Sequence, residues 1–419
     1  MRLPLLGLAL SSLLAEQSMA MPAANNNGKA LGHHKAGDPT TYSACQMPKA
    51  QGEQLKGCPN GTMYVSQTDP QAGYGSIQGA ISSLPNDIEA HHSSSLARSS
   101  HVILVGPGSY HEVLNVGRQG PLYLLGITDN PNAYESNLVR VWNSSFINQT
   151  TQTATQHNSD AVVLTVAPGK AGVLAGAGIA NSSTPAFGCS DFRVYNIDFA
   201  NRATVDGIEI IGKQTGPSAA LYTSYANTSF FSSSFSSYQD TVFIGTGSNA
   251  FFYGGIVKGF TDYLYGYGTA WFECVTMANR GCGGGITAWK GTGAPTQNMF
   301  GVYQANGWIV LSDLPLYIAL SCPLGRPWNN ASRSIYKNTY MSEIVLPQGF
   351  IAWSDKDSRV VPNLTVFGEY GSYGPGWNAA ARNTSVETVL TKDQADQYTV
   401  EKVFGGMPSW IDLGTAVIS

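Results

Sequence analysis

The stretch Ser229–Phe272 reads SFFSSSFSSYQDTVFIGTGSNAFFYGGIVKGFTDYLYGYGTAWF. Three pairs of large aromatic residues recur in it about 20 positions apart: Phe230–Phe231, Phe251–Phe252 and Trp271–Phe272. A period just above 20 with aromatic residues in register is typical of one turn of a parallel β-helix. A single coil of that kind cannot bury its inner face, and the coils stacked above and below it do so.

Short apolar runs of strand length continue on both sides of this stretch. Examples are HVILVGPG from His101, AVVLTV from Ala161 and TAWFECVTM from Thr269, each bounded by turn-forming residues. Only GSIQGAISSLP around Ile77 reads as a short helix. Many short strands without helical patterns between them fit a sandwich, a barrel or a solenoid. The period near 20 favours the solenoid, so the predicted fold class is all-β, a single-domain parallel β-helix.

Composition excludes some classes of partner. The chain has 419 residues, of which 12% are charged, and its formal net charge is −4. That balance argues against nucleic acid or an acidic membrane surface as a partner. No pair of cysteines has the CxxC spacing of a zinc site, so we expect no metal site.

The N-terminus predicts secretion. Residues 1–20 begin with one basic residue, continue with an apolar run and end in small residues, which is the pattern of a signal peptide. A membrane anchor is the alternative, but the run is shorter than the ~20 apolar residues that span a bilayer. Residues 21–60 are polar and predict a flexible segment. Residues 61–419 are assigned to the β-helix.

Cysteines and glycosylation motifs agree with an oxidising, extracellular compartment. Cys45 with Cys58 and Cys274 with Cys282 are the predicted local disulfides. Eight Asn-x-Ser/Thr motifs are candidate glycosylation sites. Their asparagines are Asn60, Asn143, Asn148, Asn181, Asn227, Asn330, Asn363 and Asn383.

Asp240 and Asp262 are the candidate catalytic pair. They lie 22 positions apart in a stretch that is otherwise poor in charge. In a β-helix, residues one turn apart lie one above the other at the strand spacing of ~4.8 Å. Two stacked carboxylates repel, so one stays ionised while the other is pushed toward its protonated form. That is a nucleophile beside a general acid. The alternative is that both aspartates only cap turns.

Three motifs resemble the signatures of the pectin methylesterases, secreted carbohydrate esterases of plants, fungi and bacteria. They are YQDTVF around Asp240, TDYLYG around Asp262 and LGRPW at Leu324–Trp328. GSYHE at Gly108–Glu112, SIQGAI at Ser76–Ile81, GITAW at Gly285–Trp289 and GEYGSYGPG at Gly368–Gly376 are similar to further family segments in the same order. The resemblance extends from about Met63 to the C-terminus. It implies a right-handed parallel β-helix, a secreted fungal-like enzyme and a monomer.

The resemblance also implies residue roles. Asp262 would attack the carbonyl carbon of a galacturonate methyl ester in pectin. Asp240 would protonate the departing methanol and then activate water. Arg326 would pair with Asp262, and Gln239 would donate its amide N–H to the developing oxyanion. Glu112 would be structural.

Aromatic residues would bind the sugar rings. The resemblance implies that Trp328 and Tyr238 offer flat surfaces to the sugars. Tyr265 falls where the family has the second Phe of its DFIFG motif, and Phe350 falls where the family has a Trp. For each of them, ordinary packing is the alternative reading.

One family feature is missing. The family has a second glutamine in a QAVAL motif, and counting 22 positions back from Gln239 reaches Pro217. Proline has neither a side-chain donor nor a backbone N–H. Losing one oxyanion donor typically costs ~10²–10³ in rate. Gln214, Ser218 and Tyr222 are the candidate replacements.

Three functions are therefore compared. The first is an active pectin methylesterase, which the retained aspartates and Arg326 favour. The second is a non-catalytic β-helix that binds pectin, which only Pro217 supports. The third is a β-helical lyase or glycosidase, for which the sequence holds neither a calcium-binding carboxylate cluster nor the polygalacturonase arrangement. No GxSxG motif indicates a serine esterase.

Overall fold

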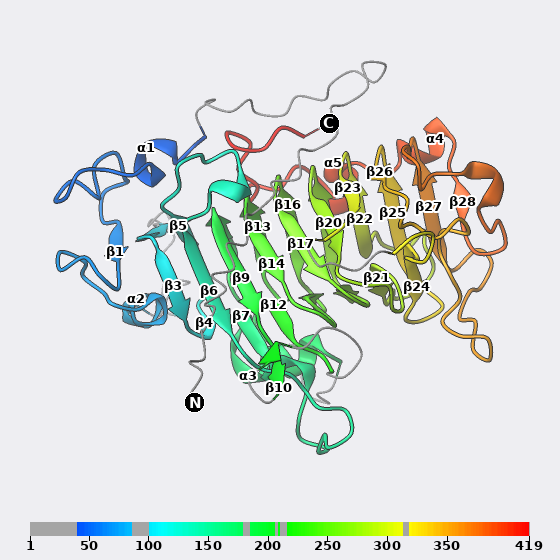
Figure 1. Ribbon diagram of the computed structural model, residues 1–419, viewed down its shortest axis with the longest axis horizontal. Helices are drawn as coiled ribbons and strands as arrows, with labels where there is room; N and C mark the ends of the chain where they lie inside the picture. The colour runs from blue at the N-terminus through cyan, green and yellow to red at the C-terminus, as the bar shows by residue number, and fades with distance from the viewer. Residues whose placement is uncertain are drawn as a thin grey trace, which may run out of the picture. The chain divides into compact units, whose positions relative to one another are not determined.

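The computed structural model describes residues 40–85, 100–178, 185–205, 208–209, 216–312 and 318–418. All of them fall within one compact unit that spans residues 34–418. Three parallel sheets make up this unit, and the predicted signal peptide lies outside the described residues. In Figure 1 the strands follow one another in sequence order along the stack, from blue β1 to orange β28.

The first sheet has 11 strands. In spatial order they are β1 (Met63–Val65), β2 (His101–Val105), β5 (Leu122–Gly126), β8 (Phe192–Tyr195), β13 (Asn227–Phe231), β16 (Asn249–Tyr253), β19 (Thr269–Glu273), β22 (Gly301–Ala305), β25 (Arg333–Lys337), β27 (Val366–Tyr370) and β28 (Thr388–Val389).

The second sheet has eight strands. They are β3 (Gly108–His111), β6 (Val139–Asn143), β9 (Ile197–Asn201), β14 (Ser234–Ser236), β17 (Ile256–Gly259), β20 (Thr276–Asn279), β23 (Trp308–Leu311) and β26 (Tyr340–Met341).

The third sheet has seven strands and carries the catalytic motifs. They are β4 (Leu114–Val116), β7 (Val162–Val166), β12 (Ala219–Thr223), β15 (Val242–Ile244), β18 (Leu264–Gly266), β21 (Thr287–Trp289) and β24 (Gly325–Pro327). A separate antiparallel pair joins β10 (Thr204–Val205) to β11 (Ile208–Glu209).

From β2 to β24 each coil contributes one strand to each of the three sheets, whereas β1 and the strands after β24 belong to coils that contribute to fewer. After β12 the chain passes through β13 and β14 and returns in β15, which pairs in parallel with β12. The next coil returns in β18 beside β15. The predicted right-handed parallel β-helix is therefore confirmed. The runs at 205–212 and 342–346, which also look like strands in the sequence, contribute none to the three sheets among their described residues.

The aromatic period marks the interior of the helix. Phe230, Phe252 and Phe272 are in register on neighbouring coils. Their ring centroids are 4.8 and 4.3 Å apart, and all three side chains are buried. Stacked rings of this kind remove large apolar areas from water, which is how successive coils stabilise one another.

The 22-residue spacing of the aspartates comes from one turn. From Leu221 in β12 to Asn227 in β13 the chain advances six positions, whereas from Val242 in β15 to Asn249 in β16 it advances seven. The other two steps of these coils are equal in length. The extra residue therefore lies in the turn GTGSNA, away from the two aspartates, which remain in register.

Eight short helices lie outside the strands of the described chain. They are α1 (Ser43–Gln46), α2 (Ile77–Ser83), η2 (Tyr134–Ser136), η3 (Asn158–Asp160), α3 (Gly169–Gly176), η4 (Ala379–Ala381), α4 (Lys392–Ala395) and α5 (Val400–Phe404). Helix α2 is the predicted one. Its N-cap Ser76 accepts from Gly79, and the Glu112 carboxylate accepts from the backbone N–H groups of Ile77 and Gln78 at 3.0 and 2.9 Å. Glu112 is thus structural, because it satisfies donors that a helix leaves open.

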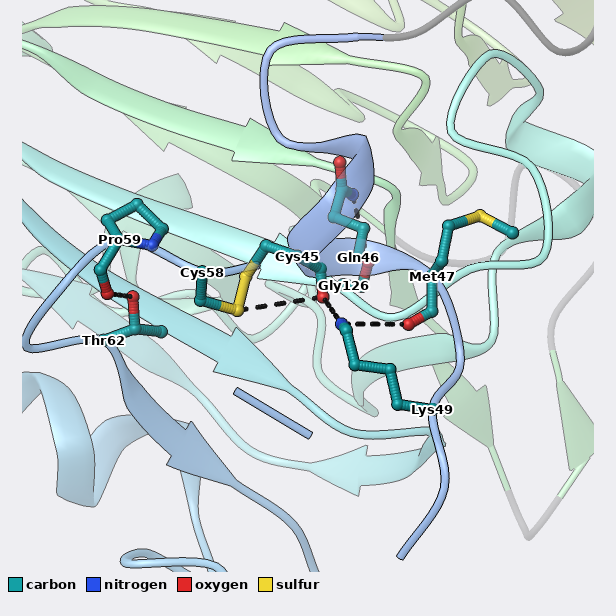
Figure 2. The surroundings of a disulfide bond; sticks show 8 residues. All are labelled: Cys45, Gln46, Met47, Lys49, Cys58, Pro59, Thr62 and Gly126. Atoms are coloured by element: carbon teal, nitrogen blue, oxygen red, sulfur yellow. Dashed lines mark hydrogen bonds between the residues drawn. A yellow bond between two sulfur atoms is a disulfide. The ribbon is translucent and has the colours of Figure 1, made fainter. Parts of the chain in front are cut away.

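Residues 40–60 differ from the predicted flexible segment, because they pack against the body. The predicted Cys45–Cys58 disulfide forms, and Cys45 is fully buried (Figure 2). The buried Gln46 side chain donates to the carbonyl of Gly126 at 3.0 Å. Thr41 Oγ1 also donates to Asp412 at 2.7 Å, so segments from both ends of the chain meet here.

The other predicted disulfide is wrong. Cys282 pairs with Cys322, and Cys274 is a buried free thiol beside Glu273. Cys274 follows a strand of the first sheet and packs with residues on its outer face, whereas Cys282 packs against the interior. Sequence proximity did not bring these two cysteines together because they belong to different sheets.

In the described parts of the chain, no helix is long and apolar enough to cross a membrane. The same residues include no group of three or more His, Cys, Asp or Glu side chains arranged to hold a metal ion.

Candidate active site

Asp240 and Asp262 lie on adjacent coils, each two residues before a strand of the third sheet. The Asp240 N–H donates to the carbonyl of Thr261 at 3.3 Å, and the Asp262 N–H donates to the carbonyl of Gly285 at 2.7 Å. Gln239 pairs with Thr261 in an isolated parallel bridge. The backbone therefore places the two carboxyl groups as neighbours, as the periodicity of the sequence predicts.

Both aspartates adopt an unusual backbone conformation. Their φ angles are +61° for Asp240 and +48° for Asp262, in the left-handed region. Aspartate tolerates this region better than most residues with a side chain. Such a conformation costs of order 1 kcal/mol and is common at functional sites. In both coils the left-handed conformation of the aspartate ends the turn before the strand of the third sheet, at the equivalent position.

Arg326 binds Asp262 through two hydrogen bonds. Its Nε donates to Oδ1 at 3.1 Å and its Nη2 donates to Oδ2 at 2.5 Å. Arg326 lies in β24, in register with Ala288 of β21 and Tyr265 of β18. It therefore reaches back across one coil, over the small side chain of Ala288. This planar two-bond pairing orients the carboxylate as well as neutralising its charge.

Gly284 leaves the room that the guanidinium occupies. A Cβ atom at this position would overlap the Arg326 guanidinium. No other residue fits there unless Arg326 moves, so Gly284 is part of the geometry of the site.

Electrostatics separate the two carboxyl groups. Burial, followed by the nearby Asp262 charge, raises the pKa of Asp240 well above its ordinary value of 3.8, although Arg326 and Gln239 oppose this. Burial also raises the pKa of Asp262, but there the hydrogen bonds and charge of Arg326 oppose the rise directly. Asp262 is therefore the group that ionises first, and Asp240 is the group that keeps its proton.

Two amide side chains accompany Asp240. Gln239 is half-buried beside it, and the hydrogen bond that lowers the pKa of Asp240 comes from this side chain. Asn158, which begins η3, donates from Nδ2 to Asp240 Oδ2 at 3.1 Å. Asn158 was not among the residues singled out in the sequence. Asn158 lies in the irregular connection between β6 and β7, and the coil from β7 to β12 that follows is also lengthened, so no period in the sequence aligns Asn158 with Asp240.

An aromatic cluster covers the outer face of the third sheet beside the aspartates. Tyr265 and Tyr267 lie 5.9 and 5.0 Å from Trp328, measured between ring centroids. Trp328 is half-buried, whereas Tyr265 is 3% exposed and presents no open ring face, so its predicted contact with a sugar is corrected. Trp353 packs against the same cluster, and the Arg326 guanidinium lies 4.0 Å from its ring centroid. Trp328 and Trp353 are both partly exposed beside the ion pair, but cations lie over their rings: Lys290 is 4.3 Å from the Trp328 ring centroid, and Arg359 is 4.2 Å from that of Trp353.

Two predicted sugar-binding aromatics are buried elsewhere. Phe350 has no exposed surface and stacks on Phe367 in the interior, with 4.3 Å between centroids. Tyr238 is 2% exposed, and the Arg280 guanidinium covers its ring at 4.4 Å. Neither ring presents a face to a ligand, so these two predictions are corrected. Trp353, three residues beyond Phe350, is the aromatic side chain that the structure places at the site.

The structure places Pro217 in the coil that precedes Gln239, as the spacing predicts. It lies directly before Ser218, whose N–H donates to the Gln239 carbonyl at 3.1 Å. Two candidate replacement donors are engaged elsewhere. The buried Ser218 hydroxyl bonds Ser237, and the buried Tyr222 hydroxyl donates to the carbonyl of Val173 at 2.6 Å. The third candidate, Gln214, lies outside the described residues.

The arrangement suits attack on an ester. The Asp262 carboxylate, oriented by Arg326, lies beside the Asp240 carboxyl group that keeps its proton, and two amide side chains lie next to Asp240. Such a set provides a nucleophile, a general acid and oxyanion donors.

Comparison with known proteins gives one family. The sequence profile of the family described as Pectinesterase matches residues 147–407, which is more than half of the chain. The probable pectinesterase A of Aspergillus niger is 26% identical over 324 residues, covering 75% of this chain and 82% of the relative. That of Aspergillus fumigatus is 24% identical over 363 residues, covering 84% of this chain and 90% of the relative.

Solved structures share the fold. The pectin methylesterase from Aspergillus niger superposes with a TM-score of 0.64 at 22% identity, covering 85% of this chain and 97% of that one. The enzyme from carrot gives a TM-score of 0.65 at 18% identity, covering 86% and 97%. A pectin methylesterase in complex with a hexasaccharide gives 0.58 at 21% identity, covering 84% and 98%.

Proposed function

The chain belongs to the pectinesterase family, and on that premise we propose that it hydrolyses the methyl esters of galacturonate in pectin, releasing methanol and leaving pectate. The ion pair of Arg326 with Asp262, next to a carboxyl group that keeps its proton, is the observation that carries this proposal.

The first half of the reaction makes an acyl-enzyme. An Asp262 carboxylate oxygen attacks the ester carbonyl carbon, and the electron pair of the C=O bond moves onto oxygen. The Gln239 side-chain amide donates to this oxyanion. When the tetrahedral intermediate collapses, the bond from carbon to the methoxy oxygen breaks, and Asp240 transfers its proton to that oxygen. Methanol leaves, and Asp262 is joined to the galacturonate through an anhydride.

The second half reverses these roles. Asp240, now ionised, takes one proton from a water molecule as its oxygen attacks the anhydride carbon. Collapse of the second intermediate breaks the bond to Asp262, which leaves as a carboxylate held by Arg326. The product is a galacturonic acid that then ionises, and Asp240 is protonated again for the next cycle.

Substrate binding completes the proposal. Trp328 and Trp353 are the partly exposed rings beside the ion pair, and the ring surface that the neighbouring cations leave uncovered packs against the apolar faces of sugars. Tyr265 supports them from beneath. The substrate is a wall polysaccharide, so we also propose that the protein is secreted, works as a monomer and needs no metal or organic cofactor, nucleic acid or membrane.

The competing function is non-catalytic binding of pectin. A site that had lost catalysis would be free of selection for the charged residues. Instead, Asp240, Asp262 and Arg326 form a complete and mutually oriented set. The retained geometry favours the esterase.

Methanol release from highly methylated pectin tests the proposal directly. We expect the purified protein to release methanol and Asp262→Asn to release none while it still binds pectin. Pectin affinity measured in parallel separates catalysis from binding. A folded wild type that binds pectin without releasing methanol would establish the binding function instead.

A further inference from the structure

The Asn158 side chain occupies the site next to the carboxyl group that protonates the leaving group. We propose that Asn158 is a catalytic residue that supplies the second oxyanion donor, in place of the glutamine that Pro217 removes. This inference rests on the proposed function, because it concerns the transition state of ester hydrolysis.

The first support is distance. Asn158 Nδ2 lies 3.1 Å from Asp240 Oδ2 and donates to it. An amide nitrogen carries two N–H groups. One of them holds Asp240. The other lies toward the Tyr265 hydroxyl without a hydrogen bond of good geometry, so it is left for a substrate oxygen bound between the two aspartates. Because Asn158 occupies Oδ2 as a donor, the acid proton of Asp240 is directed to Oδ1.

The second support is that Asn158 is held in place. The Asp160 carboxylate accepts from the His157 N–H at 3.0 Å, which closes a capping box around η3. Lys170 Nζ pairs with Asp160 at 2.8 Å. Beyond η3, the Ala161 carbonyl accepts from the Ala219 N–H at 2.9 Å, which ties the turn to β12. A donor fixed in this way does not need to reorganise during the reaction, which is the condition for an effective oxyanion site.

The third support is exclusion within the described residues. Pro217 has no donor, its carbonyl accepts from Ile147 at 2.9 Å, and the hydroxyls of Ser218 and Tyr222 are bonded to other groups. The Tyr265 hydroxyl is buried and has no hydrogen-bond partner of good geometry there. Burial and then the Asp240 charge raise the pKa of Tyr265, whereas a side-chain hydrogen-bond contact with Asn158 opposes the rise, so this ring closes the site behind the amide.

Asn158 acts at a defined step. When Asp262 attacks, the ester C=O bond becomes a single bond and its oxygen gains a negative charge. The free N–H of Asn158 donates to that oxygen together with Gln239, and it returns to its original hydrogen bonding when the C=O bond reforms. No proton is transferred from Asn158, so the residue is unchanged at the end of the cycle.

Four proteins test the proposal: the wild type, Asn158→Ala, Pro217→Gln and the double variant. We expect Asn158→Ala to lower kcat on methylated pectin by about 10²-fold, the typical effect of one oxyanion donor. KM and the melting temperature should stay near their wild-type values. The double variant should regain at least tenfold in kcat, because the glutamine restores a donor from the preceding coil. Asn115→Ala, at an exposed position outside the glycosylation motifs, is the matched control.

The outcomes separate this inference from the proposed function. If Asn158→Ala keeps kcat within about threefold of the wild type, Asn158 is not the donor. A loss that the glutamine does not rescue and that follows the melting temperature assigns Asn158 a structural role and also overturns the inference. If the wild type is inactive and Pro217→Gln is active, the esterase assignment holds but Asn158 does not replace the glutamine. If both are folded and inactive, the proposed function itself fails.

Discussion

Asp262 and Arg326 are 64 positions apart in sequence and joined by two hydrogen bonds, Nε to Oδ1 at 3.1 Å and Nη2 to Oδ2 at 2.5 Å. Their side chains are 11% and 23% exposed, so the pair is only partly screened by water. The bidentate contact fixes the plane of the carboxylate. The nucleophilic oxygen of Asp262 is therefore held in a fixed orientation, which favours attack on an ester.

The space around Arg326 gives the first prediction. Gly284→Ala should displace the guanidinium, because the added methyl group overlaps it. We expect kcat to fall by about tenfold or more, since misplaced catalytic groups lose near-attack geometry. Gly75→Ala is the matched control, because nothing lies within 4 Å of its new methyl group. Equal activity of the two variants would show that Arg326 is not held where the structure places it.

The buried acid gives a second prediction. The pKa of Asp240 is raised above 3.8 by burial and by Asp262. The folded state thus holds this proton more tightly than the unfolded state, and stability is lost as pH rises above about 4. Asp240→Asn should therefore unfold at a higher temperature than the wild type at pH 7 and at a similar temperature at pH 3.5.

The same variant should be nearly inactive. Removing a general acid typically costs 10²–10⁴ in rate, so we expect kcat on methylated pectin to fall within roughly that range. Asp355→Asn, at an exposed position, controls for the chemical change alone. A variant that is less stable than the wild type at every pH would contradict the burial argument.

A third prediction concerns a buried cluster of one arginine and two glutamates. Arg382 Nε lies 2.6 Å from Glu369 and 3.6 Å from Glu387, and all three side chains are at most 1% exposed. One cation faces two carboxyl groups. Burial and the Glu369 charge accordingly raise the pKa of Glu387 from 4.5 to about 9. Between these values the folded state holds an extra proton, so stability falls as pH rises through this window.

Glu387→Gln removes that titration. We expect the wild type to lose stability between pH 5 and pH 9, with a slope of at most about 1.4 kcal/mol per pH unit for one proton. The variant should show a flatter dependence in urea unfolding. Glu343→Gln, on the surface, should behave as the wild type does. Parallel pH slopes for wild type and Glu387→Gln would rule out a shared proton in this cluster.

The two aromatics near residue 350 give a fourth prediction. Trp353→Ala should raise KM for pectin and lower kcat, because the partly exposed ring contacts the Arg326 and Arg359 guanidiniums beside the site and helps to position Arg326. Phe350→Ala should instead lower the free energy of unfolding by about 3–5 kcal/mol, as for other buried aromatics. Its folded fraction should keep the wild-type KM. A KM change in Phe350→Ala alone would restore the original prediction from the sequence.

Glycan occupancy gives a fifth prediction. The amide of Asn227 donates to Ser190 at 3.1 Å and its oxygen accepts from Asn249 at 2.9 Å, so this side chain is committed on both sides. Asn60, Asn148, Asn330, Asn363 and Asn383 are exposed. After expression through a eukaryotic secretory pathway, peptide mass spectrometry should find glycans on the exposed group and none on Asn227. A glycan found on Asn227 would contradict this prediction, because it would show that the hydrogen bonds of this side chain do not prevent its modification.

Local sequence signals predicted the repeating parts of this protein. Apolar and aromatic residues recurring about every 20 positions have one efficient way to be buried, which is stacking in coils, so Phe230, Phe252 and Phe272 indicated the fold. Short-range geometry similarly predicted the helix at Ile77 and the disulfide between Cys45 and Cys58. The stacking of Asp240 on Asp262 followed from the same period.

Tertiary structure decided the positions of the residues that lie outside the repeating pattern. Asn158 and Trp353 come to the site from an irregular insertion and from a loop, where no repeat constrains their position. Cys282 pairs with Cys322 because the chain crosses from one sheet to another between Cys274 and Cys282. Phe350 and Tyr238 are aromatic residues of the kind that bind sugars. In the folded protein, however, the Phe350 side chain is buried in the core and the Tyr238 ring lies beneath the Arg280 guanidinium. The sequence by itself determined the coiled fold and the stacking of its two aspartates, because the residues that each coil buries recur at a regular spacing in the sequence. The three-dimensional path of the chain decided the rest of the site, since contacts between distant residues depend on where loops of unequal length return.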